Sequence, residues 1–564
     1  MHLSLRTLVT VTALAGLPSF CFASSVSLPA IAWGVCSESW VGQASGALGA
    51  RLQCGSMRVP LDHMAPDGRE IDVGVVRIRA AIPAMREGSL FFNQGGPGTH
   101  PGRLLRSMGE VWSRTDANDP GEGDKRRLAE RYDLVAVIPR GLVGSSGIRC
   151  ETLLPNRHAF LPTHQDDANW QLLVDDAQAM VDACTAPAHA RYINTEQHAH
   201  DMDTLRRILG DERLNFYGIS YGGMVGAWYA SMYPTHTGRL LLDSSMDIIH
   251  GYRAATRLLI AARNRAFYEN VVNPLLRDPM SHGLGGSADT VATSIDNFPA
   301  RAREAWVGQL DSPARLAAAL RVAAWIDSDN PPTLSALIRM INRERFSVDP
   351  GLDRRMRKEA DGLARSLFSA SAGEPSSNGD AESFFVRLAM ACNDVTWPRP
   401  EHEIRESARR DAARYFNANG DDTMEEVACS RWGGPSARQP DLAVLGRATP
   451  FLLIQSEKDT FTPLAGAQHI LDAFPNARML LVRRSDLHGV FNFTTSACIE
   501  RTAAHYLLTG VLPATPSRSF ACGNTFDNPV DALPGSPSPA AGDPVAVDPP
   551  APVAASAPVH HDEI

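Results

Sequence analysis

The chain has 564 residues, a net charge of −9 and 44% hydrophobic residues. This composition is typical of a globular protein long enough to form two compact units. The sequence contains no basic stripe and no long run of Lys or Arg, so nucleic acid is not an expected partner. No Cys-x-x-Cys is present, which argues against a zinc ribbon or a redox centre. We expect neither a cofactor nor a metal.

The first residues predict a secretory signal peptide over residues 1–23. Arg6 precedes an apolar run from Leu8 to Leu17, and small residues flank Phe22 in Cys21-Phe22-Ala23, which is a typical cleavage site. The apolar run is shorter than the roughly 20 residues that span a bilayer, which disfavours an uncleaved membrane anchor. A lipoprotein attached through Cys21 is a weaker alternative, because the bulky Phe20 precedes that cysteine. We therefore expect a periplasmic or secreted bacterial protein without stable membrane insertion after signal removal.

The cysteines support export. Eight remain after the signal, and an even number in an oxidising compartment usually forms disulfides. We favour disulfides between cysteines that follow one another along the sequence, although eight cysteines allow 105 connectivities. The neighbouring pairs are Cys36 and Cys54, Cys150 and Cys184, Cys392 and Cys429, and Cys498 and Cys522.

Short apolar runs separated by helical stretches predict an α/β fold with a mostly parallel sheet. Residues Ile71–Arg79 alternate between apolar and polar, as in a half-buried strand. The later runs are more uniformly apolar, as in strands covered on both faces. These runs are Ser89–Phe92, Tyr132–Ile138, Leu214–Tyr217, Arg239–Leu242, Phe451–Ile454 and Met479–Val482.

The apolar spacing changes to three or four residues between about His250 and Pro400, which predicts helices. Because this region interrupts the strands, we expect it to form a lid inserted into the core. The predicted organisation is an α/β core in two parts (24–249 and 401–527), a helical lid (250–400) and a disordered Pro/Ala-rich tail (528–564).

The pentapeptide Gly218-Ile-Ser220-Tyr-Gly222 follows one predicted strand directly and opens a helical stretch. A nucleophile on a tight strand-to-helix turn needs neighbours without bulk, and the two glycines meet that need. The structural alternative is a chance turn with a buried serine. In this strand–turn–helix context we predict that Ser220 is a nucleophile in an α/β-hydrolase fold.

A serine hydroxyl needs a base to take its proton and an acid to orient that base. In this fold the partners follow in the order Ser, acid, His. Asp459 lies just past one predicted strand and His488 just past the next, so we predict these two as acid and base. Glu457 and Asp486 are the competing acids.

A second group of candidates carries metal-ligating side chains on a predicted helix. The group consists of His198, His200, Asp201 and Asp203. Spacing of i and i+2 does not place such residues on one helix face, so a metal site is disfavoured there.

The chemistry also requires two backbone N–H donors for the oxyanion. The loop Asn93-Gln-Gly-Gly-Pro-Gly98 follows a predicted strand and has an uncrowded backbone. We predict that Gly96 supplies one donor and Tyr221, the residue after the nucleophile, supplies the other. A plain Gly/Pro turn is the alternative for this loop.

From about Cys54 to Cys522 the chain resembles the tripeptidyl aminopeptidase branch of the proline iminopeptidase family of exported bacterial α/β hydrolases. The matching segments are Cys54–His63, Asn93–Gly98, Pro139-Arg-Gly141, Gly218–Gly223, Leu242-Asp-Ser244, Asp459-Thr-Phe-Thr-Pro463 and Tyr506–Pro513. The resemblance implies a triad of Ser220, Asp459 and His488, and release of residues or short peptides from free N-termini. Gln94, Ile138 and Leu487 depart from the family pattern near the site, so substrate preference stays open.

The leading functional prediction is an aminopeptidase acting on peptide substrates. An aminopeptidase needs a carboxylate for the substrate ammonium group. Asp394 resembles a family position for it, but a structural role beside Cys392 is an equal alternative. Two other functions compete: an exported carboxylesterase or lipase cleaving a small acyl substrate with the same triad, and a non-catalytic binding protein on a hydrolase scaffold.

Overall fold

The computed structural model describes residues 30–147, 150, 166–185, 188–278, 282, 287–326, 330–369, 378–397, 400–414 and 420–522. The predicted signal peptide (1–23) and the predicted tail (528–564) lie outside these ranges, so both stay predictions. In the described ranges, no helix is long and apolar enough to cross a membrane.

The core is a nine-stranded sheet in the order β1-β2-β4-β3-β5-β6-β7-β8-β9. Antiparallel pairing joins β1 to β2 and β2 to β4, and all other pairs are parallel. The strands are β1 (Leu52–Pro60), β2 (Glu70–Ile78), β3 (Gly88–Asn93), β4 (Tyr132–Val137), β5 (Leu214–Ile219), β6 (Thr237–Asp243), β7 (Phe451–Ser456), β8 (Ala477–Val482) and β9 (Ser519–Ala521). The seven strands predicted from apolar runs are confirmed, and β1 and β9 were not predicted.

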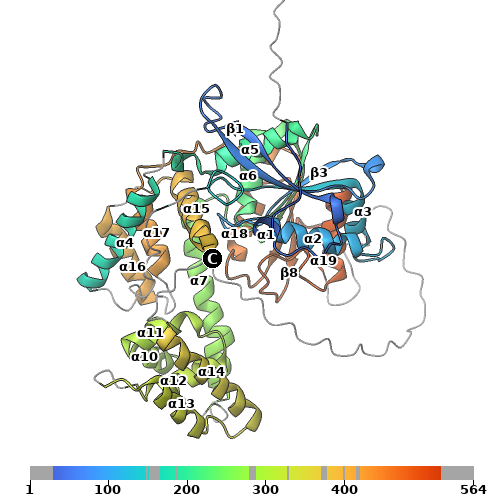
Figure 1. Cartoon of the computed structure of the whole chain (residues 1–564). Coiled ribbons are helices and arrows are strands. Elements are labelled where there is room, and N and C mark those ends of the chain that lie inside the picture. The colour runs from blue at the N-terminus through green and yellow to red at the C-terminus, as the bar shows by residue number, and fades with distance from the viewer. Residues whose placement is uncertain are drawn as a thin grey trace, which may run out of the picture.

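Helices cover the sheet on both faces (Figure 1). One group contains α2 (Gly102–Arg114), α3 (Gly123–Arg131) and α19 (Ala497–Thr509), which pack on one another. A second group contains α5 (Thr195–Ile208), α6 (Gly222–Met232) and α18 (Leu464–Ala473), and these helices pack on β4 to β8. This arrangement buries the parallel strands β3 to β7 and confirms the predicted α/β fold. A short helix, α1 (Glu38–Val41), lies against α2.

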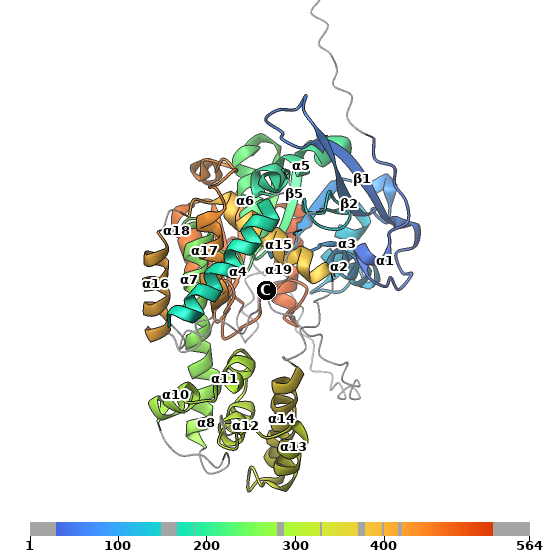
Figure 2. The same ribbon diagram turned by 60° about the vertical axis from the view of Figure 1, so that its left-hand side comes forward.

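A separate helical lobe hangs below the core in Figures 1 and 2. The helix α7 (Gly251–Phe267) leads into it, and a π-helical turn (Tyr268–Val272) continues that helix. The lobe has its own hydrophobic core around Trp306 and Phe346. Its helices are α8 (Asn273–Arg277), α10 (Ala288–Asp296), α11 (Ala300–Trp306), α12 (Pro313–Ala323), α13 (Leu334–Arg343) and α14 (Pro350–Ser369).

Four more helices form a third group, which lies beside the sheet. They are α4 (Asp167–Thr185), α15 (Asn378–Asp394), α16 (Glu401–Arg414) and α17 (Gly420–Arg431). α17 packs against α4, α15 and α16. The helical region therefore continues to Arg431, beyond residue 400, and includes α4 from the preceding part of the chain.

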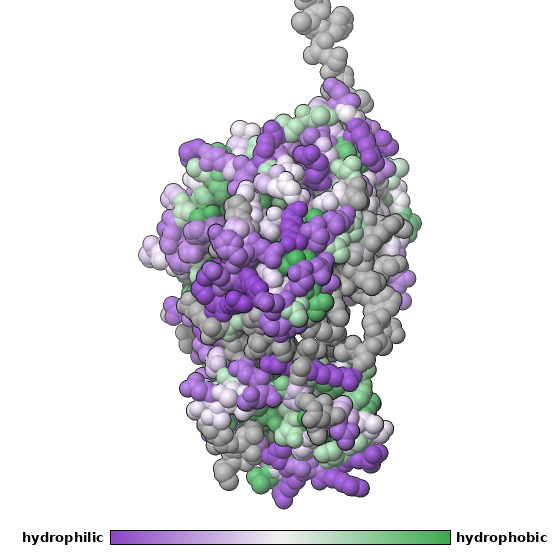
Figure 3. All heavy atoms as spheres, turned by 90° about the vertical axis from the view of Figure 1, so that its left-hand side faces the viewer, coloured by the Kyte–Doolittle hydropathy of each residue, from purple (hydrophilic) through white to green (hydrophobic). Residues whose placement is uncertain are grey.

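Four disulfides lie within the described chain, and each joins two cysteines that follow one another in the order of cysteines along the sequence. They are Cys36–Cys54, Cys150–Cys184, Cys392–Cys429 and Cys498–Cys522. The bridge between Cys392 and Cys429 ties α15 to α17. On the face shown in Figure 3, hydrophilic side chains cover most of the coloured surface of both lobes.

Candidate active site

Ser220 occupies the sharp turn between β5 and α6. Its φ of 59° lies in the left-handed region, which non-glycine residues rarely adopt without a compensating environment. A Cβ added at Gly218 would lie 2.5 Å from the Gly222 carbonyl oxygen, and one at Gly222 would lie 2.4 Å from the Asn93 carbonyl oxygen. The turn thus requires both flanking glycines, as the pentapeptide predicted.

Asp459 and His488 meet across the loops that follow β7 and β8. The Nδ1 atom of His488 lies 3.0 Å from Oδ2 of Asp459. Asp459 is buried, and its Oδ1 accepts backbone N–H groups from Phe461 (2.8 Å) and Thr462 (3.0 Å). These contacts hold the carboxylate against the imidazole.

The two competing acids, Glu457 and Asp486, have different environments. Oε2 of Glu457 accepts the backbone N–H of Arg484 at 2.6 Å. Asp486 is exposed on the loop before His488. Asp459 is therefore the carboxylate that contacts the His488 imidazole in the described chain.

The end of β6 ties the turn of Ser220 to the loop of His488. The backbone N–H of Ser220 donates to the Asp243 carbonyl at 3.0 Å. The Asp243 carboxylate accepts the N–H groups of Val490 (2.9 Å) and Phe491 (2.8 Å). Burial raises the pKa of Asp243 to about 6, and these N–H donors oppose the rise. Asp243 therefore holds the turn of Ser220 and the loop of His488 together from one strand end.

The Asn93–Gly98 loop lies directly against the nucleophile turn. A Cβ added at Gly95 would lie 2.9 Å from the Tyr221 nitrogen and 3.0 Å from the Ser220 Cβ. The Gly95 N–H already donates to Oδ1 of Asn93 at 2.9 Å. Within the described residues, the Gly96 and Tyr221 N–H groups have no protein acceptor. Both groups are thus free to donate to a ligand, and their role as oxyanion donors stays a prediction.

The helix α15 packs on the same loop from the lid side. A Cβ added at Gly98 would lie 2.5 Å from the Ser383 carbonyl oxygen and 2.8 Å from the Arg387 nitrogen. Because Gly98 also has a φ of +84°, only glycine suits this position. The lid thus contacts the loop that contains one predicted oxyanion donor.

Asp394, at the end of α15, is fully engaged with protein groups. Its Oδ2 accepts the Tyr221 hydroxyl and the Thr195 hydroxyl, the latter at 2.7 Å, and its Oδ1 accepts the Thr195 N–H at 2.8 Å. Burial raises the pKa of Asp394 to about 6, against the effect of these donors. The arrangement places Asp394 in contact with the side chain of Tyr221 and gives it a structural role.

The residues weighed as metal ligands on α5 do not converge. Nε2 of His198 contacts Asn93, and Nδ1 of His200 contacts the Tyr233 hydroxyl. Asp201 accepts two hydrogen bonds from the Arg140 guanidinium, and Asp203 accepts one from Arg206. Each side chain thus has a separate structural partner.

Comparisons with known proteins agree with this geometry. Residues 90–331 match the family model of the alpha/beta hydrolase fold, and residues 415–519 match that of the TAP-like proteins. The first match contains the loop of Gly96 and the turn of Ser220, and the second contains Asp459 and His488. The chain is a serine hydrolase of the α/β-hydrolase fold.

Relatives of the hydrolase cover most of its length. It is 27% identical over 512 residues to the tripeptidyl aminopeptidase of Streptomyces coelicolor, covering 87% of this chain and 86% of the relative. It is 23% identical over 492 residues to the serine protease Hip1 of Mycobacterium tuberculosis, covering 82% and 86%. It is 23% identical over 515 residues to carboxylesterase B of Mycobacterium tuberculosis, covering 87% and 90%.

The hydrolase also contains contacts that the sequence patterns did not reveal. The Thr462 hydroxyl donates to the Ser244 carbonyl at 2.7 Å, and it lies 3.0 Å from Oδ2 of Asp459 and 3.2 Å from Nδ1 of His488. The Ser244 hydroxyl accepts the Gly489 N–H at 2.9 Å. The short segments around Thr462 and Ser244 were part of the family resemblance, but only the folded chain assigns them contacts.

Proposed function

We propose that the hydrolase is an aminopeptidase that releases residues or short peptides from free N-termini through an acyl-enzyme on Ser220. His488 takes the hydroxyl proton of Ser220 as the oxygen attacks the scissile carbonyl carbon. Asp459 keeps the imidazole in the required tautomer and stabilises the imidazolium. The N–H groups of Gly96 and Tyr221 stabilise the oxyanion.

The collapse of the tetrahedral intermediate breaks the peptide C–N bond. His488 gives its proton to the departing amine, which leaves the substrate acyl group on the Ser220 oxygen. A water molecule then attacks the ester carbonyl and gives a proton to His488. The second intermediate breaks the bond to the Ser220 oxygen, which takes that proton from His488 as the acid product leaves. Removal of one oxyanion donor typically lowers kcat by about a hundredfold to a thousandfold.

The packing of α15 on the oxyanion loop is the observation that favours an exopeptidase. The contact at Gly98 brings the lid to within van der Waals distance of a loop that lies against Ser220. A lid at this distance would limit how much of the substrate extends on the acyl side. The names of two relatives, a tripeptidyl aminopeptidase and a serine protease, support a peptide substrate.

For the substrate ammonium group we propose Glu425 of α17. Its Oε2 accepts a hydrogen bond from the Arg387 guanidinium at 2.6 Å, while its buried Oε1 has no hydrogen-bond partner among the described residues. Arg387 also donates to the Tyr252 hydroxyl at 3.2 Å, and the Tyr252 ring lies 6.2 Å from the Tyr221 ring. Glu425 is thus connected to the Tyr221 side chain through Arg387 and Tyr252. A buried carboxylate oxygen without a donor suits an ammonium ligand.

Matched variants test this role. We expect Glu425→Gln to raise KM for peptides with a free N-terminus by at least about tenfold, because an ionic hydrogen bond contributes about 1.5–3 kcal/mol. The neighbouring Glu426 pairs with Arg253 at 2.9 Å, so Glu426→Gln should leave KM nearly unchanged. Equal changes in both variants would argue against Glu425.

Blocked peptides test the aminopeptidase itself. Peptidyl-anilides with a free N-terminus should be cleaved, whereas the same peptides with an acetylated N-terminus should not, because they lack the ammonium charge. Equal cleavage of both would reject the aminopeptidase. Preferential cleavage of short acyl esters would favour the esterase alternative, which the resemblance to a carboxylesterase keeps open.

We further propose that the hydrolase is exported. The four disulfides support an oxidising compartment, and the sequence predicts a signal that ends at Ala23. The mature protein should begin near Ser24 and contain no free thiol. N-terminal sequencing and thiol titration in denaturant measure both, and several thiols without reduction would contradict export.

A further inference from the structure

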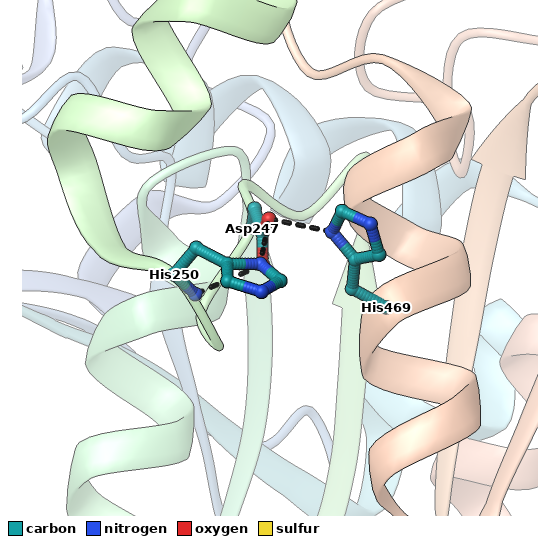
Figure 4. A group of neighbouring side chains, drawn as sticks. All are labelled: Asp247, His250 and His469. Carbon is teal, nitrogen blue, oxygen red and sulfur yellow. Dashed lines mark hydrogen bonds and ion pairs between the residues drawn. The ribbon is translucent and has the colours of Figure 1, made fainter.

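Asp247, His250 and His469 form a cluster outside the proposed triad. The Nδ1 atom of His250 lies 2.8 Å from Oδ2 of Asp247, and the Nδ1 atom of His469 lies 2.7 Å from the same oxygen. Figure 4 shows the two imidazoles approaching the carboxylate from two different segments. The three ligand atoms lie within 4.8 Å of one another, and no other such group of His, Cys, Asp or Glu was found in the described chain.

The cluster joins the start of the lid to the core. Asp247 follows β6, and His250 directly precedes α7, the helix that leads into the lower lobe. His469 lies on α18, which begins just past the loop of Asp459. A Cβ added at Gly466 of α18 would lie 3.1 Å from the Asp247 Cβ, so the three segments are closely packed.

The cluster combines a fixed buried carboxylate with accessible imidazoles. Oδ1 of Asp247 accepts the backbone N–H groups of Ile249 (3.0 Å) and His250 (3.3 Å), which leaves Oδ2 to face both rings. The Asp247 side chain is 1% exposed, whereas those of His250 and His469 are 51% and 39% exposed. Part of each imidazole is therefore in contact with solvent.

The donor set selects the class of ion. Two imidazole nitrogens and one carboxylate oxygen suit Zn²⁺ and similar transition metals better than Mg²⁺ or Ca²⁺, which prefer oxygen ligands. Ligands at about 2.0–2.1 Å from a tetrahedral Zn²⁺ are roughly 3.3 Å apart. The observed separations from Oδ2 are shorter by about half an ångström, so small rotations of the two exposed rings would admit the ion.

We propose that Asp247, His250 and His469 bind one divalent cation of the Zn²⁺ type, which fastens the first lid helix to α18. The proposal does not depend on the peptidase function, because none of the three residues belongs to the proposed catalytic site. The ion replaces the two hydrogen bonds when each imidazole is neutral and carries its proton on Nε2, which leaves Nδ1 free to bind the metal. A bridge of metal–ligand bonds then connects α7 and α18. The ion thereby stabilises the position of α7.

Equilibrium dialysis against Zn²⁺ tests the site in the full-length, EDTA-treated protein. The adjacent His560 and His561 near the C-terminus are first replaced by Ala, because they could bind Zn²⁺ themselves. We expect one Zn²⁺ per chain. Loss of a partner that only supports a ligand already weakens metal binding by about tenfold to a hundredfold, so His250→Gln and His469→Gln should weaken it at least tenfold.

Glutamine keeps an N–H group for Asp247, so these variants should fold. His505→Gln is the matched control, because His505 contacts Asp124 at 2.9 Å in a simple pair. This variant should bind Zn²⁺ as the parent does. Absence of Zn²⁺ binding, or equal binding by the His469→Gln and His505→Gln variants, would overturn the site.

Thermal unfolding tests the connection between lid and core. Since a ligand that binds only the folded chain stabilises it, Zn²⁺ should raise the Tm of the parent and of the His505→Gln variant, and should not raise that of the His469→Gln variant. Limited proteolysis within α7 should slow with Zn²⁺ in the parent. Binding of Zn²⁺ with no change in Tm or proteolysis would overturn the stabilising role.

Discussion

The sheet edge and the helical lid position functional residues in different ways. At the sheet edge, Ser220, Asp459 and His488 each follow a strand or lie in the loop after one, and backbone hydrogen bonds fix their turns. In the helical region, α15 packs on the loop of Gly98. α15 also packs against α17, and α17 packs against α4 from far earlier in the chain. Local sequence therefore determines where the proposed triad lies, whereas long-range packing determines which helices lie beside it.

The comparison predicts that changes at the sheet edge abolish turnover and that changes in the lid alter its efficiency. The largest effect should follow Ser220→Ala, which should lower kcat by about a millionfold, because it removes the nucleophile on which the triad acts. The free energy of unfolding should change little, since only a hydroxyl is lost. Substantial activity in the folded variant would refute the catalytic role of Ser220.

The orienting acid should have the next largest effect. Asp459→Asn should lower kcat by about ten-thousandfold, because the amide favours the wrong tautomer of His488. Glu457→Gln is the matched control, since Glu457 contacts the backbone of Arg484 instead, and it should retain most of the activity. The opposite ranking in steady-state assays would make Glu457 the acid.

The contact between lid and oxyanion loop should have a smaller effect. Gly98→Ala should lower kcat/KM by about a hundredfold, because its Cβ would collide with the backbone of α15 and small displacements of reacting groups have effects of this size. Gly210→Ala introduces similar backbone strain, at a φ of +73°, with no atom within 4 Å of the added Cβ. This control should lose about 1–2 kcal/mol of stability and keep its activity. Equal activities of the Gly98→Ala and Gly210→Ala variants would show that the contact of α15 with this loop does not affect catalysis.

The smallest effect concerns the pH dependence of stability. The folded pKa of Asp394 is raised to about 6 by burial, so between pH 4 and 6 the folded chain binds a proton that the unfolded chain releases. This carboxyl therefore contributes stability at low pH, and the contribution is lost as the pH rises through 6. One pKa unit corresponds to about 1.4 kcal/mol, so the contribution is up to about 3 kcal/mol.

Asp394→Asn should remove this pH-dependent contribution. The free energy of unfolding of the variant should fall furthest below that of the wild type near pH 4, and the gap should narrow at pH 7. Urea unfolding at both values measures the difference. A gap that widens toward pH 7 would show that ionised Asp394 stabilises the fold.

The sheet and the positions of Ser220, Asp459 and His488 after strands could be predicted from sequence because their signals are local. The seven predicted strands are buried apolar runs, and the pentapeptide around Ser220 identifies a strand–turn–helix. β1 and β9 were missed: β1 mixes polar and apolar residues, and β9 has only three residues. The cluster of Asp247, His250 and His469 brings together residues more than 200 positions apart, so local spacing could not reveal it.

The contacts that α15 makes at Gly98 and through Asp394 could not be predicted from the sequence either. Gly98 belonged to a predicted oxyanion loop, but nothing local indicated that α15 packs on it. Asp394 was weighed for substrate binding because of its resemblance to a family position, yet its oxygens accept hydrogen bonds from Tyr221 and Thr195. Such roles depend on which distant helix supplies the neighbouring atoms.

A fluorophosphonate label with peptide mapping tests the catalytic role of Ser220 most directly, because the reagent reacts with a serine only where a base and an oxyanion site activate it. We predict one label per chain, on Ser220, with labelling slowed strongly by Asp459→Asn and unaffected by Glu457→Gln. Ser244, which also has a positive φ of 48°, should remain unlabelled. A label on Ser244 or another serine, or no label on the folded protein, would contradict the proposed catalytic site.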